Sequence, residues 1–273
     1  METKPTGLEK VAQACRLLRT RNLFWSWYEP RNFGDWIGPF LFRKFTNTTP
    51  LFCSKKLQAR TTCLFSAGSI LRHLKHPNCA TIWGSGIISK SDQFAMPRKV
   101  LAVRGPETRD AMLRQGYECP AIYGDPGVLL PLFISRLKKR SARIGIIPHF
   151  IETETYKKAH LEGVHIIDVC RPVEDVSSDI ASCSLTYSSS LHGLIVSHAF
   201  GIPSIWMASS KELDGDDVKF EDYFSSCGLS ATKRNSILNA PVASSDESSA
   251  TLPDHGPLRH ALLQSLPTGW RRQ

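Results

Sequence analysis

The chain has 273 residues, a length that fits about two domains of ordinary size. Hydrophobic residues make up 41% and charged residues 22% of it, which excludes a disordered or low-complexity chain. Lys and Arg number 34 against 25 Asp and Glu, so the net charge is +9. This basic balance favours an anionic partner and leaves open nucleic acid, an acidic membrane surface, or a phosphorylated or carboxylated substrate.

Cysteine usage and hydropathy indicate the cellular compartment in which the protein is expected. None of the eight cysteines forms a C-x-x-C pair or has a Cys or His partner at zinc-ligand spacing, so we expect reduced, mostly buried thiols and no metal site. The amino-terminal segment lacks the apolar core of a signal peptide, and no run approaches the roughly 20 apolar residues of a spanning helix. We therefore expect a soluble cytoplasmic protein.

Short apolar runs bounded by Gly or Pro alternate with amphipathic segments along the chain. The expected strands, in chain order, are 22–28, 63–67, 81–84, 99–103, 121–123, 143–147, 164–169, 184–187 and 204–207. The expected helices are 35–45, 106–115, 191–200 and 258–266. This alternation predicts an α/β fold with mostly parallel sheets.

A charged segment at 135–142 (SRLKKRSA) separates two stretches of this pattern. It is either a solvated linker or a contact to phosphate or membrane. Because the strand–helix alternation restarts after it, we expect two Rossmann-like domains, at 1–135 and 143–238. Residues 239–273 read as a loose connector rich in Ser, Pro and Asp followed by a C-terminal helix.

Nearly every expected strand ends in Gly and polar residues, which together predict a lined cleft at the carboxyl ends of the strands. Gly68, Gly84 and Gly86 form no complete nucleotide-binding fingerprint. They serve either tight turns or a close approach of backbone amides to a phosphate or sugar.

The segment R-G-P-E-T-R combines cations with a helix start. Arg104 ends an expected strand and Pro106 begins a helix, whose free N–H groups attract an anion. The Arg104 guanidinium suits a carboxylate or phosphate. Arg109 is either a second anion contact or an ion-pair partner of a neighbouring acid.

The segment S-S-S-L-H-G repeats this geometry in the second half. One serine is expected to cap the helix, and His192 falls in its first turn, where it serves as a general acid or binds an anion as imidazolium. His149 ends another strand and is a second candidate. His198 lies deeper in the same helix and is interpreted as packing or surface.

Two acidic loops complete the candidates. Asp35, in N-F-G-D, is either a helix cap or a carboxylate that accepts a proton from a sugar hydroxyl. Asp125, in G-D-P, is either a turn residue or part of the cleft.

Taken in order, these motifs resemble the polysaccharide pyruvyl transferase family. The matching segments are N-x-G-D (32–35), the glycines at 68 and 84–86, V-R-G-P-x-T-R (103–109), G-D-P (124–126), I-P-H (147–149), S-x-L-H-G (189–193) and G-I-P (201–203). The sequences of these segments are most similar to those of the succinoglycan-type exopolysaccharide branch. Ser190 stands where many members have Arg, and a serine can still donate a hydrogen bond.

The resemblance implies two Rossmann-like domains facing a cleft, as in GT-B glycosyltransferases, with the acceptor on the N-terminal side and the donor on the C-terminal side. It implies transfer of pyruvate from phosphoenolpyruvate to two hydroxyls of one sugar, giving a cyclic ketal, with no cofactor and no metal. In this hypothesis His192 is the general acid or phosphate ligand, Arg104 clamps the donor, and Asp35 is the acceptor-side base.

The resemblance also assigns the supporting residues and partners. His149 and Arg109 support donor binding, and the substrate-binding set further includes Asn32, Gly34, Gly68, Gly86, Asp125, Ser189 and Ser190. The acceptor is expected to be a lipid-linked saccharide at the inner membrane face, where scattered basic residues would keep the enzyme close to anionic lipid.

Two alternatives remain open. A sugar-nucleotide glycosyltransferase could share the fold, because fold does not determine function. A non-catalytic basic module binding nucleic acid or membrane is the second, although the basic residues are scattered and no recognition motif is present.

Overall fold

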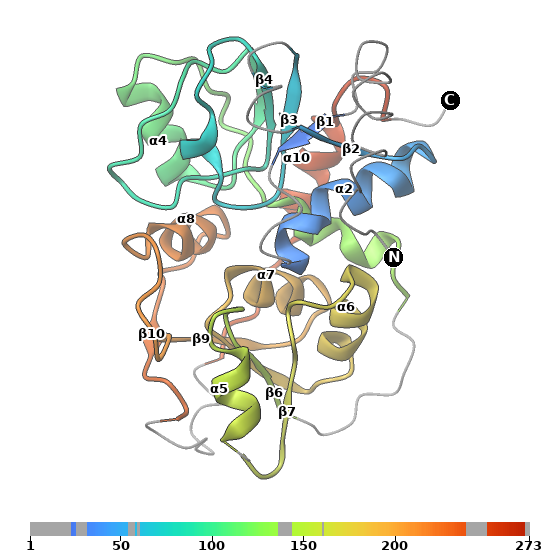
Figure 1. Ribbon diagram of the computed structural model, residues 1–273, viewed down its shortest axis with the longest axis vertical. Coiled ribbons are helices and arrows are strands. Elements are labelled where there is room, and N and C mark those ends of the chain that lie inside the picture. Colours follow the sequence, from blue (N-terminus) through green and yellow to red (C-terminus); the bar gives the residue numbers. More distant parts are fainter. Residues whose placement is uncertain are drawn as a thin grey trace, which may run out of the picture.

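The computed structural model describes residues 32–53, 58, 61–135, 144–159, 161–238 and 250–270, together with the backbone of 23–25. These residues form an α/β fold with two five-stranded sheets, in which every pairing between strands is parallel (Figure 1). The predicted α/β class with parallel sheets is confirmed.

The first sheet has the strand order β2-β1-β3-β4-β5. Its strands are β1 (Leu23–Trp25), β2 (Leu51–Cys53), β3 (Cys63–Phe65), β4 (Ala80–Trp83) and β5 (Lys99–Ala102). The helical segments of this half are α2 (Phe33–Thr46), η1 (Leu71–His73), α4 (Pro106–Arg114) and η2 (Pro126–Leu132). Pro106 starts α4, where the missing N–H costs nothing.

The second sheet has the order β10-β9-β8-β6-β7. Its strands are β6 (Ile144–Ile147), β7 (Val164–Ile166), β8 (Leu185–Ser188), β9 (Ser204–Met207) and β10 (Lys233–Arg234). The helices that alternate with them are α5 (Thr153–Lys158), α6 (Val173–Ala181), α7 (Leu191–Ala199) and α8 (Val218–Ser226), and α10 (Gly256–Gln264) follows.

Both sheets follow the same plan. Numbered within its own half, each sheet has the order 2-1-3-4-5, which is one of the two common orders of doubly wound folds. In such a sheet the strand order reverses between the first and third strands, and ligands bind outside the carboxyl ends of those two strands. The switch points here lie between β1 and β3 and between β6 and β8.

A shared hydrophobic core joins the two halves. Helices α2, α7 and α8 lie between the sheets (Figure 1). Phe33 and Trp83 from the first half belong to the same buried cluster as Ile195 and Trp206 from the second. Because this apolar surface is buried jointly, the halves stabilise each other.

Several predicted elements differ from the observed ones. The expected strand at 121–123 is wrong: it makes one parallel bridge, Val103 to Tyr123, because Pro120 and the turn at Gly124 leave too few residues for a strand. Strands β2 and β10 and helices α5, α6 and α8 were not predicted. The expected boundary at 135–142 lies outside the described residues except for Ser135, and so does the first part, 239–249, of the connector expected at 239–257.

Most of the described cysteines are buried, as predicted. Cys53, Cys63, Cys79, Cys119 and Cys183 are buried free thiols, whereas Cys170 and Cys227 are partly exposed. Among the described residues, no helix is both long and apolar enough to cross a membrane.

A buried histidine network ties the C-terminal segment to the second half. The Tyr223 hydroxyl lies 2.7 Å from Nδ1 of His198 and 2.9 Å from Nε2 of His255. Both imidazoles are almost fully buried, and burial lowers the pKa of His198 to about 3 and that of His255 to about 4. Of the two interpretations given for His198, packing or surface, the structure supports packing, and His255 packs beside it.

This network predicts a loss of stability in mild acid. Between the unfolded pKa of about 6.5 and the folded values, the unfolded chain binds protons that the folded chain rejects, so stability falls as pH drops. Urea denaturation at about pH 7.5 and 5.5 should show a smaller fall for His255→Gln than for the wild type, by about 1 kcal/mol. His260→Gln, at an exposed position of α10, should behave as wild type; equal falls in all three proteins would contradict the prediction.

Candidate active site

The first switch point carries Asp35. Asn32 caps α2, and its Oδ1 accepts a hydrogen bond from the Gly34 N–H at 3.1 Å, which places Asp35 in the first turn of the helix. Gly68 follows β3 with a φ of +109°, and a Cβ added there would lie 3.1 Å from Oδ1 of Asp35. A residue with a side chain at position 68 would be strained and would crowd the carboxylate.

The second switch point carries His149 and the serines that follow β8. Ser189 Oγ accepts from the His149 N–H at 2.9 Å and donates to Oε2 of Glu152 at 2.6 Å. Ser190 caps α7, its Oγ accepting from the Gly193 N–H at 3.4 Å. The cap fixes His192 in the first turn of α7, as the sequence predicts.

The two switch points meet at His192. Its imidazole packs on Gly34, where any Cβ would overlap the ring at Nδ1, and it meets the Phe33 ring edge-on at a centroid distance of 6.3 Å. Its Nε2 lies 3.4 Å from Oδ2 of Asp125. The structure thus joins three residues far apart in sequence, Asp35, Asp125 and His192, which we call the Asp–His group.

Burial and charge set the electrostatics of the Asp–His group. Burial raises the pKa of Asp35 to about 6; the imidazole of His192 opposes this shift and the carboxylate of Asp125 adds to it. Asp125 is fully buried, with Oδ1 accepting from the Gly127 N–H at 2.8 Å. A carboxyl group that titrates near neutral pH beside a histidine is well matched to moving protons.

Arg104 occupies a different environment from the expected one. Its side chain is fully buried, and it donates from Nε to Asp222 at 2.9 Å, from Nη1 to Ser69 at 2.5 Å and from Nη2 to the Ile87 carbonyl at 2.6 Å. Asp222 also accepts from the backbone and the hydroxyl of Thr108. Arg104 therefore holds α8 of the second half against the first, and its role as a donor clamp stays a prediction.

The Arg104 side chain nevertheless lies near the Asp–His group. Ser69, its partner, directly follows Gly68, which adjoins Asp35. Gly86 lies against the guanidinium, with no space for a Cβ, and its N–H donates to the Gly68 carbonyl at 3.0 Å. The absence of a side chain at Gly86 thus leaves space for the Arg104 guanidinium, and the Gly86 N–H already donates a hydrogen bond within the protein.

Two other predicted residues have environments that bear on their roles. Arg109 donates from Nε to the Cys119 carbonyl at 3.1 Å, and the structure does not join it to the Asp–His group. Burial and the nearby Lys219 ammonium lower the pKa of His149 to about 4, so the imidazole is neutral near pH 7. The His149 imidazole can donate or accept a hydrogen bond, but it has no positive charge that could attract an anionic substrate.

Sequence reasoning missed Asp222 and Lys219 of α8. Their segment, V-K-F-E-D-Y-F, has Val218, Phe220, Tyr223 and Phe224 buried, so an apolar pattern could have indicated the helix. Nothing in the spacing indicates that Asp222 pairs with an arginine 118 positions earlier.

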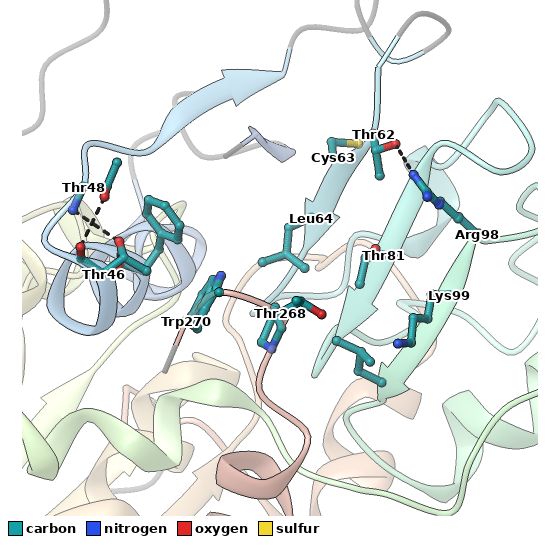
Figure 2. Close-up of a pocket in the computed structure, with 14 residues that line it drawn as sticks. Thr46, Thr48, Thr62, Cys63, Leu64, Thr81, Arg98, Lys99, Thr268 and Trp270 are labelled. Atoms are coloured by element: carbon teal, nitrogen blue, oxygen red, sulfur yellow. Dashed lines mark hydrogen bonds between the residues drawn. The ribbon is translucent and has the colours of Figure 1, made fainter. Parts of the chain in front are cut away.

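A separate cavity of about 500 Å³ lies away from this site (Figure 2). Its lining includes Cys63, Thr81 and Lys99, at or next to the amino ends of β3, β4 and β5, and Trp270 from the C-terminal segment. Arg98 at its edge donates to Thr62 at 3.1 Å. Since ligands of parallel sheets bind at the carboxyl ends of the strands, we do not assign the reaction to this cavity.

Among the described residues no cluster of three or more His, Cys, Asp or Glu could hold a metal ion.

The chain is thus an α/β protein with two parallel sheets, whose switch points meet at the buried Asp–His group. The chain belongs to the polysaccharide pyruvyl transferase family, whose model matches residues 63–211, more than half of its length. The predicted family is confirmed, and the particular branch stays a prediction.

Two individual proteins are similar to the chain. An uncharacterized protein of Acanthamoeba polyphaga mimivirus is 31% identical over 157 residues, covering 54% of this chain and 55% of that protein. The match therefore spans about half the length of this curated relative. A crystal structure of an uncharacterized Klebsiella pneumoniae protein aligns with 81% of this chain and 94% of its own at 14% identity and a TM-score of 0.46.

Proposed function

We propose that the protein transfers pyruvate from phosphoenolpyruvate to two hydroxyls of one sugar, forming a cyclic ketal and releasing phosphate. The family membership supports a pyruvyl transfer role. The observation that carries the proposal is the meeting of Asp35 and His192, one from each switch point. We place the acceptor beside the first switch point and the donor beside the second, with a cleft between two GT-B-like domains.

The proposed reaction needs two kinds of proton transfer. Protonation of the donor methylene by His192 leaves an oxocarbenium-like carbon, which a sugar hydroxyl attacks as Asp35 takes its proton. Phosphate then leaves with the bridging oxygen and one proton, and the second hydroxyl closes the ketal. The two sugar hydroxyls lose two protons in total. One proton ends on the donor methylene, which becomes a methyl group, and the other leaves with phosphate, so the reaction balances.

Asp125 serves the proposed mechanism by positioning. It is fully buried and held by the Gly127 N–H, so it offers His192 Nε2 a fixed carboxylate at 3.4 Å. This fixed contact holds the imidazole in one orientation, as a group that moves protons requires.

The direct test is phosphate release from phosphoenolpyruvate across a panel of lipid-linked or aryl glycosides. His192→Gln should lower the rate by about 100-fold to 10,000-fold, the range for a lost general acid, whereas His76→Gln, at an exposed position, should match the wild type. Near-normal turnover by His192→Gln would remove His192 from the mechanism. Stabilisation by sugar nucleotides but not by phosphoenolpyruvate in a thermal-shift screen would favour a glycosyltransferase instead.

Gly34 provides a geometric test of the same site. In Gly34→Ala the added Cβ overlaps the His192 ring, so the imidazole must move. We expect a loss of about 100-fold in turnover, as for an ångström-scale misplacement of a reacting group, with unchanged circular dichroism. Gly116→Asn is the control, because no atom lies within 4 Å of a Cβ there and Asn tolerates its positive φ. Full activity in Gly34→Ala would show that the contact is not needed.

We further propose a cytoplasmic enzyme whose acceptor is lipid-linked at the membrane surface. The basic segments expected to face the membrane, 135–142 and the terminal W-R-R-Q, lie outside the described residues except for Ser135 and Trp270. Co-sedimentation with anionic vesicles at rising salt would test this localisation.

A further inference from the structure

The segment between β9 and α8, residues 209–217, connects the ligand-binding edges of the two sheets. It begins beyond the carboxyl end of β9, and ligands of parallel sheets bind outside these ends. Its acidic side chains contact residues that follow the carboxyl ends of β3 and β4 in the other sheet. We call residues 209–217 the strap.

The strap is fastened to the second half at a buried carboxylate. Glu152 is fully buried, and its Oε1 accepts from the Ser210 N–H at 2.5 Å and from the Ser210 hydroxyl at 2.8 Å. Its Oε2 accepts from Ser189 at 2.6 Å, so one carboxylate holds both the strap and the loop after β8. Lys211 donates from Nζ to the Ile151 carbonyl at 2.7 Å. Hydrogen bonds to a buried carboxylate are costly to break, so this end of the strap is fixed.

The other end of the strap contacts the first half through exposed groups. Asp214 pairs with the Arg72 guanidinium through both oxygens, with 3.0 Å between Nη1 and Oδ1. Asp216 Oδ2 accepts from the Ser89 hydroxyl at 3.0 Å and from the Lys90 N–H at 2.9 Å. The side chains of Arg72 and Asp214 are 35% and 59% exposed. Exposed ion pairs are screened by water and salt and add little stability, so this end can release while the Glu152 end stays fastened.

Gly215 lets the strap lie directly on the first half. Its φ is +100°, in the region that favours glycine, and a Cβ added there would overlap the Ile88 carbonyl oxygen. Ile88 directly follows Ile87, whose carbonyl accepts from Arg104 Nη2 at 2.6 Å. The strap is therefore seated on a loop beside the candidate site.

The reacting groups of that site are poorly accessible in this closed arrangement. Asp125 is fully buried and His192 is 6% exposed, so a substrate reaches them only when a neighbouring segment moves. We propose that the strap is hinged at Glu152 and opens at Arg72 and Lys90, admitting the substrate and then closing over it. Closure would exclude water from the proton transfers. Only the identity of the admitted substrate rests on the proposed function.

Two backbone amides report on the two ends of the strap separately. The Lys90 N–H is paired when the strap is closed, whereas the Ser210 N–H is paired at the fixed end. Amide-resolved hydrogen–deuterium exchange of the full chain should show less protection at Lys90 than at Ser210. Arg72→Met should lower the protection of Lys90 about two- to fivefold, the effect of losing one exposed ion pair, and leave that of Ser210 unchanged.

A matched control uses another exposed ion pair between the halves. Lys44 of α2 pairs with Glu174 of α6, and Lys44→Met should leave both amides as protected as in the wild type. The charge-exchanged variant Arg72→Asp/Asp214→Arg should restore protection at Lys90. If Arg72→Met left Lys90 unchanged, or exposed Lys90 and Ser210 equally, the hinged strap would be wrong.

Phosphoenolpyruvate separates the strap from the proposed function. At saturation it should raise the protection of the Lys90 amide at least about twofold, because a ligand shifts the population toward the state that holds it. Turnover of phosphoenolpyruvate without this effect would overturn the gating role and leave the proposed function intact. If phosphoenolpyruvate were neither turned over nor protective, the proposed function would fall, and the exchange of Lys90 in Arg72→Met would still decide for or against the hinged strap.

Discussion

Asp35→Asn should abolish most of the activity and at the same time stabilise the protein. The loss of the proposed base should lower turnover by about 100-fold to 10,000-fold. The folded pKa of Asp35 is about 6, above the unfolded value of 3.8, so the ionised carboxylate disfavours the folded state above pH 6. Asparagine keeps the shape without this charge, and the free energy of unfolding near pH 8 should rise by about 3 kcal/mol.

Urea denaturation and phosphate release on the same samples check both halves of this prediction. Asp110→Asn, at an exposed position of α4, is the matched control and should change neither quantity. In the wild type, kcat/KM should rise as the pH increases through about 6, because a general base acts when deprotonated. An active Asp35→Asn enzyme, or a destabilised one, would contradict the assignment.

Breaking the pair between Arg104 and Asp222 should produce the largest loss of stability. Both side chains are fully buried, so Asp222→Ala leaves a guanidinium charge without compensation and unpairs Thr108. Loss of one partner of a buried ion pair costs about 3–5 kcal/mol. We expect chemical denaturation to show a decrease of that size.

The neighbouring residue supplies the control for this prediction. Glu221, also on α8, pairs with Lys90 of the first half, but both side chains are largely exposed, so Glu221→Gln should have little effect. The double variant Arg104→Met/Asp222→Leu should recover much of the loss, because it removes the charge as well as its partner. If Asp222→Ala were no less stable than Glu221→Gln, the buried pair would not hold the halves together.

These predictions assign two different tasks to adjacent parts of the site. Asp35 and His192 are held close together and accept an electrostatic cost, as expected where a pKa must lie near the working pH. Arg104 and Asp222 are fully compensated and fix α8.

Much of the fold could be predicted from hydrophobic patterning. Strand β9 (204–207) was expected at its observed bounds, and β4, β5, β6 and β8 within one residue at each end. Strands β2 and β10 were not predicted, because strands of two or three residues at sheet edges are too short to show a periodic hydrophobic pattern. The strand order, which repeats in both sheets, could not be read from a sequence without a fixed-period repeat.

Part of the candidate active site could also be predicted from the sequence. Polar residues at the carboxyl ends of strands marked Asp35, Asp125 and His192, and the structure brings these three together. The same reasoning gave Arg109 as a second anion contact or an ion-pair partner of a neighbouring acid, and in the structure its Nε donates to the Cys119 carbonyl. Arg104 also differs from expectation, since its acidic partner comes from a helix 118 residues later.

Local periodicity and motifs within a few residues were enough to predict the α/β class, the family resemblance and the short list of residues at strand ends. The meeting of those residues, and the space that Gly34 leaves for the His192 ring, could be seen only in the folded chain. Contacts, burial and charge balance are set by packing between elements far apart along the chain, and no local pattern records them.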